Sequence, residues 1–226
     1  LNSYNDERRL IQAGGAMKSE ERKDFDKEAA QWDANPGRVK LAGEVADAII
    51  REAAPASGMD VLDFGCGTGL VTLRLQPLVR SITGADSSAG MLAVLESKVK
   101  SQGLANVRTR HVDFEKGGRV GGAFDLVVSS MTMHHVKDTT ALFRQWYDLL
   151  LPGGMLAAAD LDLEDGSFHG DNAGVFHLGF DRGHILNLLQ KTGFRDVRAV
   201  TAATVARDIE GGGKREFPVF LIVGRK

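Results

Sequence analysis

The sequence has 226 residues, of which 43% are hydrophobic and 26% are charged, and its formal net charge is −2. These values are ordinary for a globular chain with one sizeable core, and the length is short for two domains. The charges are nearly balanced and form no long basic block. Composition therefore argues against nucleic acid or an anionic membrane as the main partner.

The single cysteine, Cys66, excludes a disulfide within the chain and fits a reducing compartment. No apolar run reaches transmembrane length, and no signal-peptide pattern opens the sequence. We therefore expect a cytoplasmic protein that does not bind membranes. Residues 1–16 differ in character from the rest of the sequence and are interpreted as a tag, a leader or a poorly ordered extension.

Two helices are expected before the first strand. Residues 19–34 have aromatic and small side chains at helical spacing, and Asn35-Pro36-Gly37 is expected to end this helix. Residues 38–54 have the apolar face of a second helix. We therefore predict that residues 17–58 form a helical part that covers the ligand crevice, and that residues 59–226 form the main domain.

Strands and helices alternate along that main domain. The expected strands are 61–64, 80–85, 107–112, 124–130, 155–159, 196–206 and 216–223. The expected helices are 70–75, 89–102, 138–151 and 181–192. A glycine run separates the last two strands, which are expected to pair as an antiparallel hairpin. The prediction is an α/β fold: a seven-stranded, mostly parallel, doubly wound sheet with helices on both faces.

The most informative stretch joins the first strand to the helix after it. The strand ends at Asp63, and Gly65, Gly67 and Gly69 follow at alternate positions. Glycine lets the backbone turn sharply and approach a ligand, and the first N–H groups of the next helix face the same place. The pattern predicts a nucleotide site. Leu70 stands where a dinucleotide fingerprint has its third glycine, which disfavours a nicotinamide cofactor.

Five motifs in order resemble those of the class I S-adenosylmethionine-dependent methyltransferases. They lie at residues 63–69, 86–91, 113–114, 124–129 and 150–156. The resemblance runs from about Phe25 to the end of the sequence. Within this family, residues 133–138 and the Pro-Gly-Gly signature look most like the small-molecule branch that includes the quinone-biosynthesis C-methyltransferases.

The resemblance implies S-adenosylmethionine as the cofactor. In this family pattern, Asp86 accepts hydrogen bonds from the ribose hydroxyls, and Asp113 accepts from the adenine amine while Phe114 packs on the adenine ring. Asp63 either orients the glycine turn or contacts the methionine amino group. The complete set of expected contacts is Trp32, Asp63, Gly65, Cys66, Gly67, Thr68, Gly69, Asp86, Ser87, Met91, Asp113, Phe114, Ser129 and Ser130. Alternative roles stay open: Asp86 as a helix N-cap, Asp113 as a solvated acid, and the two serines as strand terminators.

Methyl transfer requires the acceptor to be aligned with the sulfonium methyl carbon and shielded from water. A hydroxyl or an acidic carbon also needs a base. His134 and His135 follow the fourth strand at the crevice and are the leading candidates, with Asp160 at the end of the fifth strand as a third. The alternative for the histidines is packing under the helix that comes after them.

Residues 160–181 are long for a connection and rich in Gly, His and Asp, so we predict a lid or a wall of the acceptor pocket. Such acids and histidines could hold a divalent metal, as in catechol-type O-methyltransferases, but their spacing matches no metal motif and no metal is predicted. Phe25 and Trp32 are expected to close over the site or to pack on the domain. Arg38 would meet the methionine carboxylate or lie on the surface.

The leading hypothesis is therefore a methyltransferase that acts on a small-molecule acceptor. A protein that binds S-adenosylmethionine without turnover and an NAD-dependent oxidoreductase are the alternatives. The sequence names neither the acceptor nor the atom that is methylated, and it leaves the oligomeric state unknown.

Overall fold

The computed structural model describes residues 24–114, 116–208 and 212–226. Its strands are β1 (Asp60–Phe64), β2 (Ser81–Asp86), β3 (Val107–His111), β4 (Phe124–Ser130), β5 (Leu150–Leu161), β6 (Arg195–Asp208) and β7 (Lys214–Arg225). Its α-helices are α2 (Phe25–Glu28), α3 (Pro36–Ala53), α4 (Leu70–Leu75), α5 (Ala89–Gln102), α6 (Thr139–Leu149) and α7 (Arg182–Thr192). Short 3₁₀ helices are η1 (Ala29–Ala34), η2 (Gln76–Leu78) and η3 (Met133–His135). The extension predicted for residues 1–16 lies outside the described residues.

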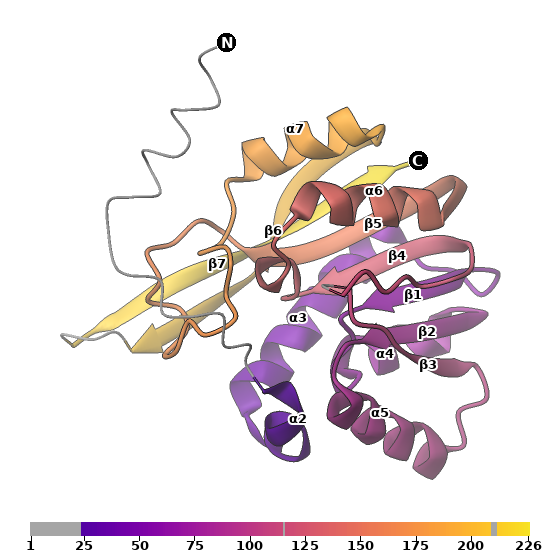
Figure 1. Ribbon diagram of the computed structural model, residues 1–226, viewed down its shortest axis with the longest axis horizontal. Coiled ribbons are helices and arrows are strands. Elements are labelled where there is room, and N and C mark those ends of the chain that lie inside the picture. The colour runs from indigo at the N-terminus through magenta and orange to yellow at the C-terminus, as the bar shows by residue number, and fades with distance from the viewer. Residues whose placement is uncertain (1–23, 115, 209–211) are drawn as a thin grey trace.

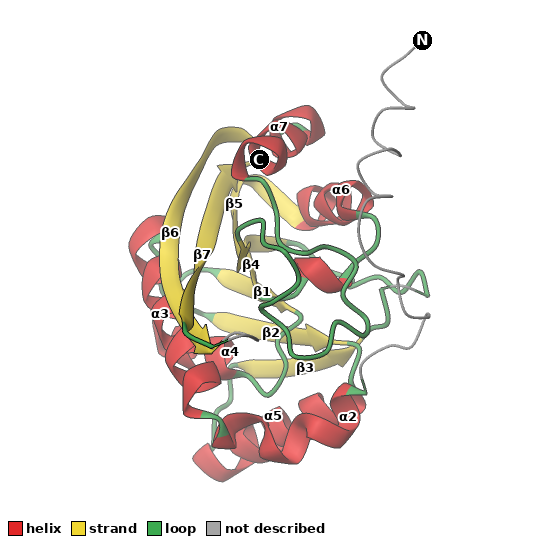
Figure 2. Cartoon of the chain, turned by 90° about the vertical axis from the view of Figure 1, so that its left-hand side faces the viewer, coloured by secondary structure: helices red, strands yellow, loops and turns green. Residues whose placement is uncertain are grey.

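The strands form a seven-stranded sheet in the order β3-β2-β1-β4-β5-β7-β6 (Figure 1). Neighbouring strands from β3 to β5 run parallel, while β7 is antiparallel to both β5 and β6. Helices α3 and α4 cover one face of the sheet and α6 and α7 cover the other (Figure 2). The predicted α/β fold and its antiparallel C-terminal hairpin are confirmed.

Apolar side chains on both faces of β1 explain its place in the middle of the sheet. Val61 packs in the core beneath α3, and the next residue, Leu62, packs in the core beneath α6. Successive side chains of a strand point to opposite faces, so a continuous apolar run fills both cores. None of the described helices is long and apolar enough to cross a membrane.

The N-terminal helices differ from their prediction in two places. Within the described part of residues 19–34, the chain forms the short helix α2 and then the 3₁₀ helix η1, instead of one continuous helix. Asn35-Pro36-Gly37 begins α3, whereas the sequence pattern predicts only a break after the preceding helix. The Asn35 side chain accepts hydrogen bonds from the N–H groups of Gly37 (2.9 Å) and Arg38 (3.3 Å). An asparagine N-cap followed by proline is a strong helix start.

The boundary between α6 and β5 also differs from the prediction. Helix α6 ends at Leu149, and β5 begins directly at Leu150 and includes the Pro-Gly-Gly segment. Proline restricts the residue before it to an extended conformation, which stops the helix early. Gly153 then donates to the carbonyl of Lys226 (3.1 Å), and Lys226 donates to Gly154 (2.9 Å). The Pro-Gly-Gly segment is therefore held by Lys226, which follows β7.

The β6–β7 hairpin is longer than predicted and continues beyond β5. The last residue of β5 to pair with β7 is Leu161, opposite Val219. Pairing between β6 and β7 continues for further residues, up to Asp208 opposite Lys214. Because β5 ends at the carboxyl edge of the parallel strands, this extension carries the end of the hairpin past that edge.

Candidate functional site

A cavity of about 410 Å³ lies at the carboxyl ends of the parallel strands. It is lined by segments from all along the chain: α2, η1, α3, the glycine turn after β1, the ends of β2 and β4, η3, residues 168–175 and β6. The site residues predicted from the sequence that line this cavity are Trp32, Asp63, Gly65, Cys66, Gly67, Thr68, Asp86, Ser87, Met91, Phe114, Ser130, His134 and His135. The structure therefore gathers most of the predicted site residues around one space.

Four predicted residues do not line this cavity. Gly69 packs against α5, because a Cβ there would lie 2.3 Å from Leu95. Ser129 is buried and donates to the carbonyl of Phe64 (2.9 Å). Asp113 forms an ion pair with Lys116 (3.2 Å), and Asp160 lies behind His134.

The glycine turn has the left-handed backbone that its sequence predicts. The φ angles are +72° at Gly65, +53° at Gly67 and +84° at Gly69. Gly65 donates its N–H to the carbonyl of Ala85 (2.7 Å), and Gly67 donates to the Asp86 carboxylate (2.8 Å). These bonds tie the turn to the end of β2, so it holds its shape before any ligand arrives.

Gly65→Ala is expected to destabilise the protein more than Gly103→Ala. Both glycines have positive φ, +72° and +63°, but a Cβ at Gly65 would lie 2.3 to 2.8 Å from three Thr132 side-chain atoms, whereas a Cβ at Gly103 meets nothing within 4 Å. The backbone strain common to both is about 1 kcal/mol, and the clash at Gly65 adds about 2 kcal/mol. Urea unfolding of both variants measures the difference, and equal midpoints would contradict this account.

Two acidic side chains face the cavity beside the turn. Asp63 is buried and accepts a hydrogen bond from the Thr72 hydroxyl (2.6 Å). Burial, with a contribution from the charge of Asp86, raises the pKa of Asp63 to about 7. Burial also raises the pKa of Asp86, although its carboxylate accepts from the N–H groups of Gly67 and Ser88 (2.8 and 2.9 Å).

Ser88, rather than Asp86, caps helix α5. The Ser88 hydroxyl accepts from the N–H of Met91 (3.0 Å), which is the usual N-cap geometry. The alternative role of Asp86 as the helix cap is therefore not what the structure shows. Cys66 also lines the cavity, but burial raises the pKa of its thiol, which disfavours a nucleophilic thiolate.

Two acids that the sequence analysis missed fasten α2 and η1 across the cavity. We call residues 25–34 the N-terminal cover. Asp26 accepts from the Ser88 hydroxyl (2.5 Å) and from the N–H of Gly90 (2.8 Å). Asp33 accepts from the Thr68 hydroxyl (2.6 Å) and pairs with Lys98. Their partners lie on the glycine turn and on α5, so the cover is held by the same elements that bear the predicted cofactor contacts.

Aromatic side chains of the cover face the histidines. The Phe25 ring lies 5.9 Å from Trp32 and 5.2 Å from His135, edge to face in both cases. The Arg38 guanidinium lies 3.7 Å above the Trp32 ring and pairs with Glu28 (3.0 Å). A stacked cation fixes the indole plane at the cavity wall.

His134 and Asp160 form a buried pair at the end of β5. The Asp160 carboxylate lies 2.7 Å from the His134 Nδ1 and also accepts from the His134 backbone N–H (3.2 Å). Burial opposes ionisation of Asp160, but the charge interaction and hydrogen bonds with His134 outweigh it and hold the pKa of Asp160 below its ordinary value. An ionised Asp160 accepts the Nδ1 proton, which leaves Nε2 of His134 as the basic nitrogen.

His135 is held in one neutral form. Its Nδ1 lies 2.7 Å from the carbonyl of Gly174, and a carbonyl only accepts, so Nδ1 carries the proton. Burial and the neighbouring His134 lower the pKa of His135 to about 3. The His134 ring lies 4.1 Å from His135 and 5.0 Å from His169. Three imidazoles therefore gather at this end of the cavity.

The connection between β5 and α7 packs against η3. Phe176 donates its N–H to the carbonyl of His134 (2.9 Å), and the His177 ring nitrogen lies 3.0 Å from the carbonyl of Val136. Arg182 forms two hydrogen bonds with Asp162 (2.6 and 2.8 Å) at the base of the connection. In the described part of the chain, no group of three or more His, Cys, Asp or Glu residues is arranged to hold a metal ion.

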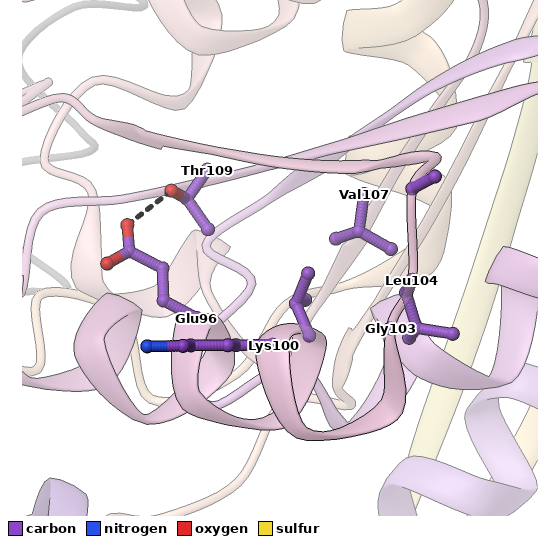
Figure 3. Close-up of a pocket in the computed structure, with 8 residues that line it drawn as sticks. Glu96, Lys100, Gly103, Leu104, Val107 and Thr109 are labelled. Atoms are coloured by element: carbon purple, nitrogen blue, oxygen red, sulfur yellow. Dashed lines mark hydrogen bonds between the residues drawn. The ribbon is translucent and has the colours of Figure 1, made fainter.

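A second hollow, of about 260 Å³, lies between α5 and β3 (Figure 3). It is lined by Glu96, Val99, Lys100, Gly103, Leu104, Ala105, Val107 and Thr109, none of which is a predicted site residue. The Glu96 carboxylate accepts a hydrogen bond from the Thr109 hydroxyl (2.5 Å). This hollow provides residues for control variants.

Comparisons with known proteins find methyltransferases. Residues 61–154 match a family model described as a methyltransferase domain. Over 162 residues the chain is 33% identical to an uncharacterized methyltransferase of Schizosaccharomyces pombe, a match that covers 65% of this chain and 57% of that protein. Over 139 residues it is 31% identical to the ubiquinone biosynthesis O-methyltransferase of Ruegeria pomeroyi, covering 59% and 55%. The chain thus spans just over half the length of these curated relatives.

Solved structures show the same fold. The YcgJ protein of Bacillus subtilis has a TM-score of 0.66 at 16% identity, covering 81% of this chain and 98% of that one. The phosphoethanolamine N-methyltransferase 2 of Haemonchus contortus, solved with S-adenosyl-L-methionine, also has a TM-score of 0.66, at 17% identity, covering 90% and 60%. Residues 61–154 therefore match a methyltransferase domain, and the chain has the fold of these solved structures.

Proposed function

We propose that the chain transfers a methyl group from S-adenosylmethionine to a small-molecule acceptor by in-line displacement. The observation that carries this proposal is that one cavity joins the glycine turn and Asp86 to His134 and His135. A methyl donor held by the glycine turn and Asp86 would meet an acceptor held near His134 and His135 inside a partly closed space. The ubiquinone biosynthesis O-methyltransferases among the relatives support a small acceptor and the predicted likeness to quinone-biosynthesis enzymes.

In this proposal, residues at the end of β2, in the glycine turn and near η3 would hold S-adenosylmethionine. Asp86 accepts hydrogen bonds from the ribose hydroxyls, while Met91 and Phe114 border the adenine. Phe114 is already positioned, because its ring stacks on Phe64 with the centroids 3.7 Å apart. Asp63 faces the positively charged methionine end. When bound, the cofactor supplies an electrophilic methyl carbon.

The His134–Asp160 pair supplies the base. As the acceptor oxygen bonds to the methyl carbon, the carbon–sulfur bond breaks and its electron pair stays on sulfur, which gives S-adenosylhomocysteine. Nε2 of His134 takes the proton of the acceptor hydroxyl, and Asp160 stabilises the resulting imidazolium through the 2.7 Å contact with Nδ1. His135 stays neutral because its pKa is about 3.

The direct test has two stages. Calorimetry of the full chain with S-adenosylmethionine measures donor binding, and release of S-adenosylhomocysteine is then measured with a panel of phenols, catechols and amines. Binding with release supports the proposal, and binding without release on any acceptor supports the non-catalytic alternative. Absence of binding overturns both. The cytoplasmic location and the absence of a nucleic-acid partner stay predictions.

Donor affinity is expected to fall as the pH drops below 7. The pKa of Asp63 is about 7 in the free protein, so this side chain is an anion at pH 8 and mostly neutral at pH 6. Only the anion attracts the cationic methionine end, so binding at pH 6 is expected to be about tenfold weaker than at pH 8. Calorimetry of wild type and Asp63→Asn across this range separates Asp63 from the titration of the ligand itself. An equal pH slope in both proteins would contradict this role.

A further inference from the structure

Arg207 lies near the end of the hairpin that extends past β5, and it lines the cavity. The sheet order puts β6 at the opposite edge from β3 and β2, and β2 ends at Asp86. Arg207 therefore approaches from the side away from the predicted ribose contact. The ring on which its guanidinium stacks, Phe168 at 4.1 Å, belongs to the connection that packs against η3. Both features place Arg207 on the acceptor side of the cavity.

The charge of Arg207 is not neutralised by any carboxylate in the described residues, because it forms no ion pair there. The contrast with its neighbours is clear. Arg215 faces Arg207 in the hairpin register and pairs with Asp165, while Arg38 pairs with Glu28. Arg207 is exposed in the free protein, but partial desolvation of its guanidinium and the nearby charge of Arg38 lower its pKa. An anion beside Arg207 would relieve this repulsion.

Apart from Arg38, which is paired with Glu28, the remaining walls of the acceptor side are mainly flat and uncharged. It is lined by four rings in succession, with centroids 5.2 Å apart for Phe25 and His135, 6.3 Å for His135 and His169, and 4.8 Å for His169 and Phe168. One acid, Asp171, also lines the cavity, but it is exposed and accepts from the N–H of Ala173 (3.0 Å). Such walls suit a planar ring, which can stack against aromatic side chains.

We propose that the methyl acceptor is an aromatic carboxylate whose carboxylate is bound by Arg207. This proposal rests on the proposed function, since it names the acceptor of the same site. A guanidinium fixed by stacking presents two parallel N–H donors, which match the two oxygens of a carboxylate. Bound in this way, the ring lies among the aromatic walls and directs a ring hydroxyl toward His134. The other anion that Arg207 could bind is the methionine carboxylate of the cofactor, and the experiment separates the two.

The test uses the full chain saturated with S-adenosylhomocysteine and two probes of equal shape, benzoate and neutral benzamide, titrated by calorimetry. The wild type is expected to bind benzoate at least tenfold more tightly than benzamide. Arg207→Gln is expected to abolish this preference, and Arg207→Lys to keep part of it. Arg215→Gln is the matched control, because it removes the facing arginine outside the cavity, and it should leave the preference unchanged.

Three results would overturn the proposal. Equal binding of benzoate and benzamide would show that the acceptor side does not select an anion, and an unchanged preference in Arg207→Gln would assign the anion to another residue. A loss of S-adenosylhomocysteine affinity in Arg207→Gln would assign Arg207 to the cofactor carboxylate. If the wild type does not bind S-adenosylhomocysteine, the proposed function fails instead. The titrations with benzoate and benzamide are then carried out on the cofactor-free chain, where the same preference for benzoate tests anion binding by Arg207 separately.

Discussion

Replacement of Asp86 by alanine is expected to weaken S-adenosylmethionine binding about 100-fold, which corresponds to about 3 kcal/mol. In wild type, the Asp86 carboxylate holds the N–H of Gly67 and, in our proposal, accepts from the two ribose hydroxyls. Its loss leaves these donors without their acceptor in a partly buried site, at about 1–3 kcal/mol for each unmade bond. Isothermal titration calorimetry measures the change.

Asp86→Asn and Glu96→Gln complete this experiment. Asparagine keeps one acceptor oxygen, so Asp86→Asn is expected to bind more tightly than Asp86→Ala and more weakly than wild type. Glu96 lies on α5 outside the cavity, where its carboxylate accepts a hydrogen bond from the Thr109 hydroxyl. Removal of its charge should leave donor affinity unchanged. Equal affinity in wild type and Asp86→Ala would overturn the ribose assignment.

The second large effect is expected at His134. Substitution of His134 by glutamine should lower kcat about 10²- to 10⁴-fold for an oxygen acceptor, because the general base is lost. Donor affinity should stay within about twofold. Single-turnover formation of S-adenosylhomocysteine measures the chemical step apart from product release. His177→Gln is the matched control, since the His177 ring contacts Val136 and does not line the cavity.

Asp160→Asn tests how His134 is held. An asparagine amide can donate to Nδ1, which would move the imidazole proton to Nε2 and block the basic nitrogen. Activity should therefore fall as far as in His134→Gln, although the carboxylate itself does not line the cavity. Retention of activity in both variants would exclude the proposed base and leave alignment as the main contribution of this side of the site.

The glycine turn could be predicted from the sequence because its cause is local. Three alternate glycines indicate three positions with left-handed backbone conformation. The acid at the end of β2 lies next to these glycines in any parallel sheet of this strand order. The strand and helix periodicities indicated the seven-stranded fold for the same reason. Errors arose at Pro36 and Pro152, where one proline starts a helix and the other lies inside a strand.

The contacts that close the site could not be predicted, because they join residues far apart in the sequence. Asp33 meets Thr68 across 35 positions, and Asp26 meets Ser88 across 62. Nothing local distinguishes these acids from other surface acids of a charged segment. Arg207 was missed for a related reason: the predicted strand ends one residue before it, and only the register of the hairpin shows how far the hairpin extends.

The two sides of the cavity, which in our proposal bind the methyl donor and the acceptor, come from different parts of the sequence. Most of the residues that we propose to bind the donor come from one stretch, residues 63–91, which lies inside the matched methyltransferase domain at 61–154. Many of the residues that we propose to bind the acceptor come from residues 168–175 and Arg207, which lie outside that domain. In evolution, substitutions in these outlying segments can therefore change the acceptor while the donor site persists. Relatives recognised through the common domain are accordingly expected to share a methyl donor and to diverge in what they methylate.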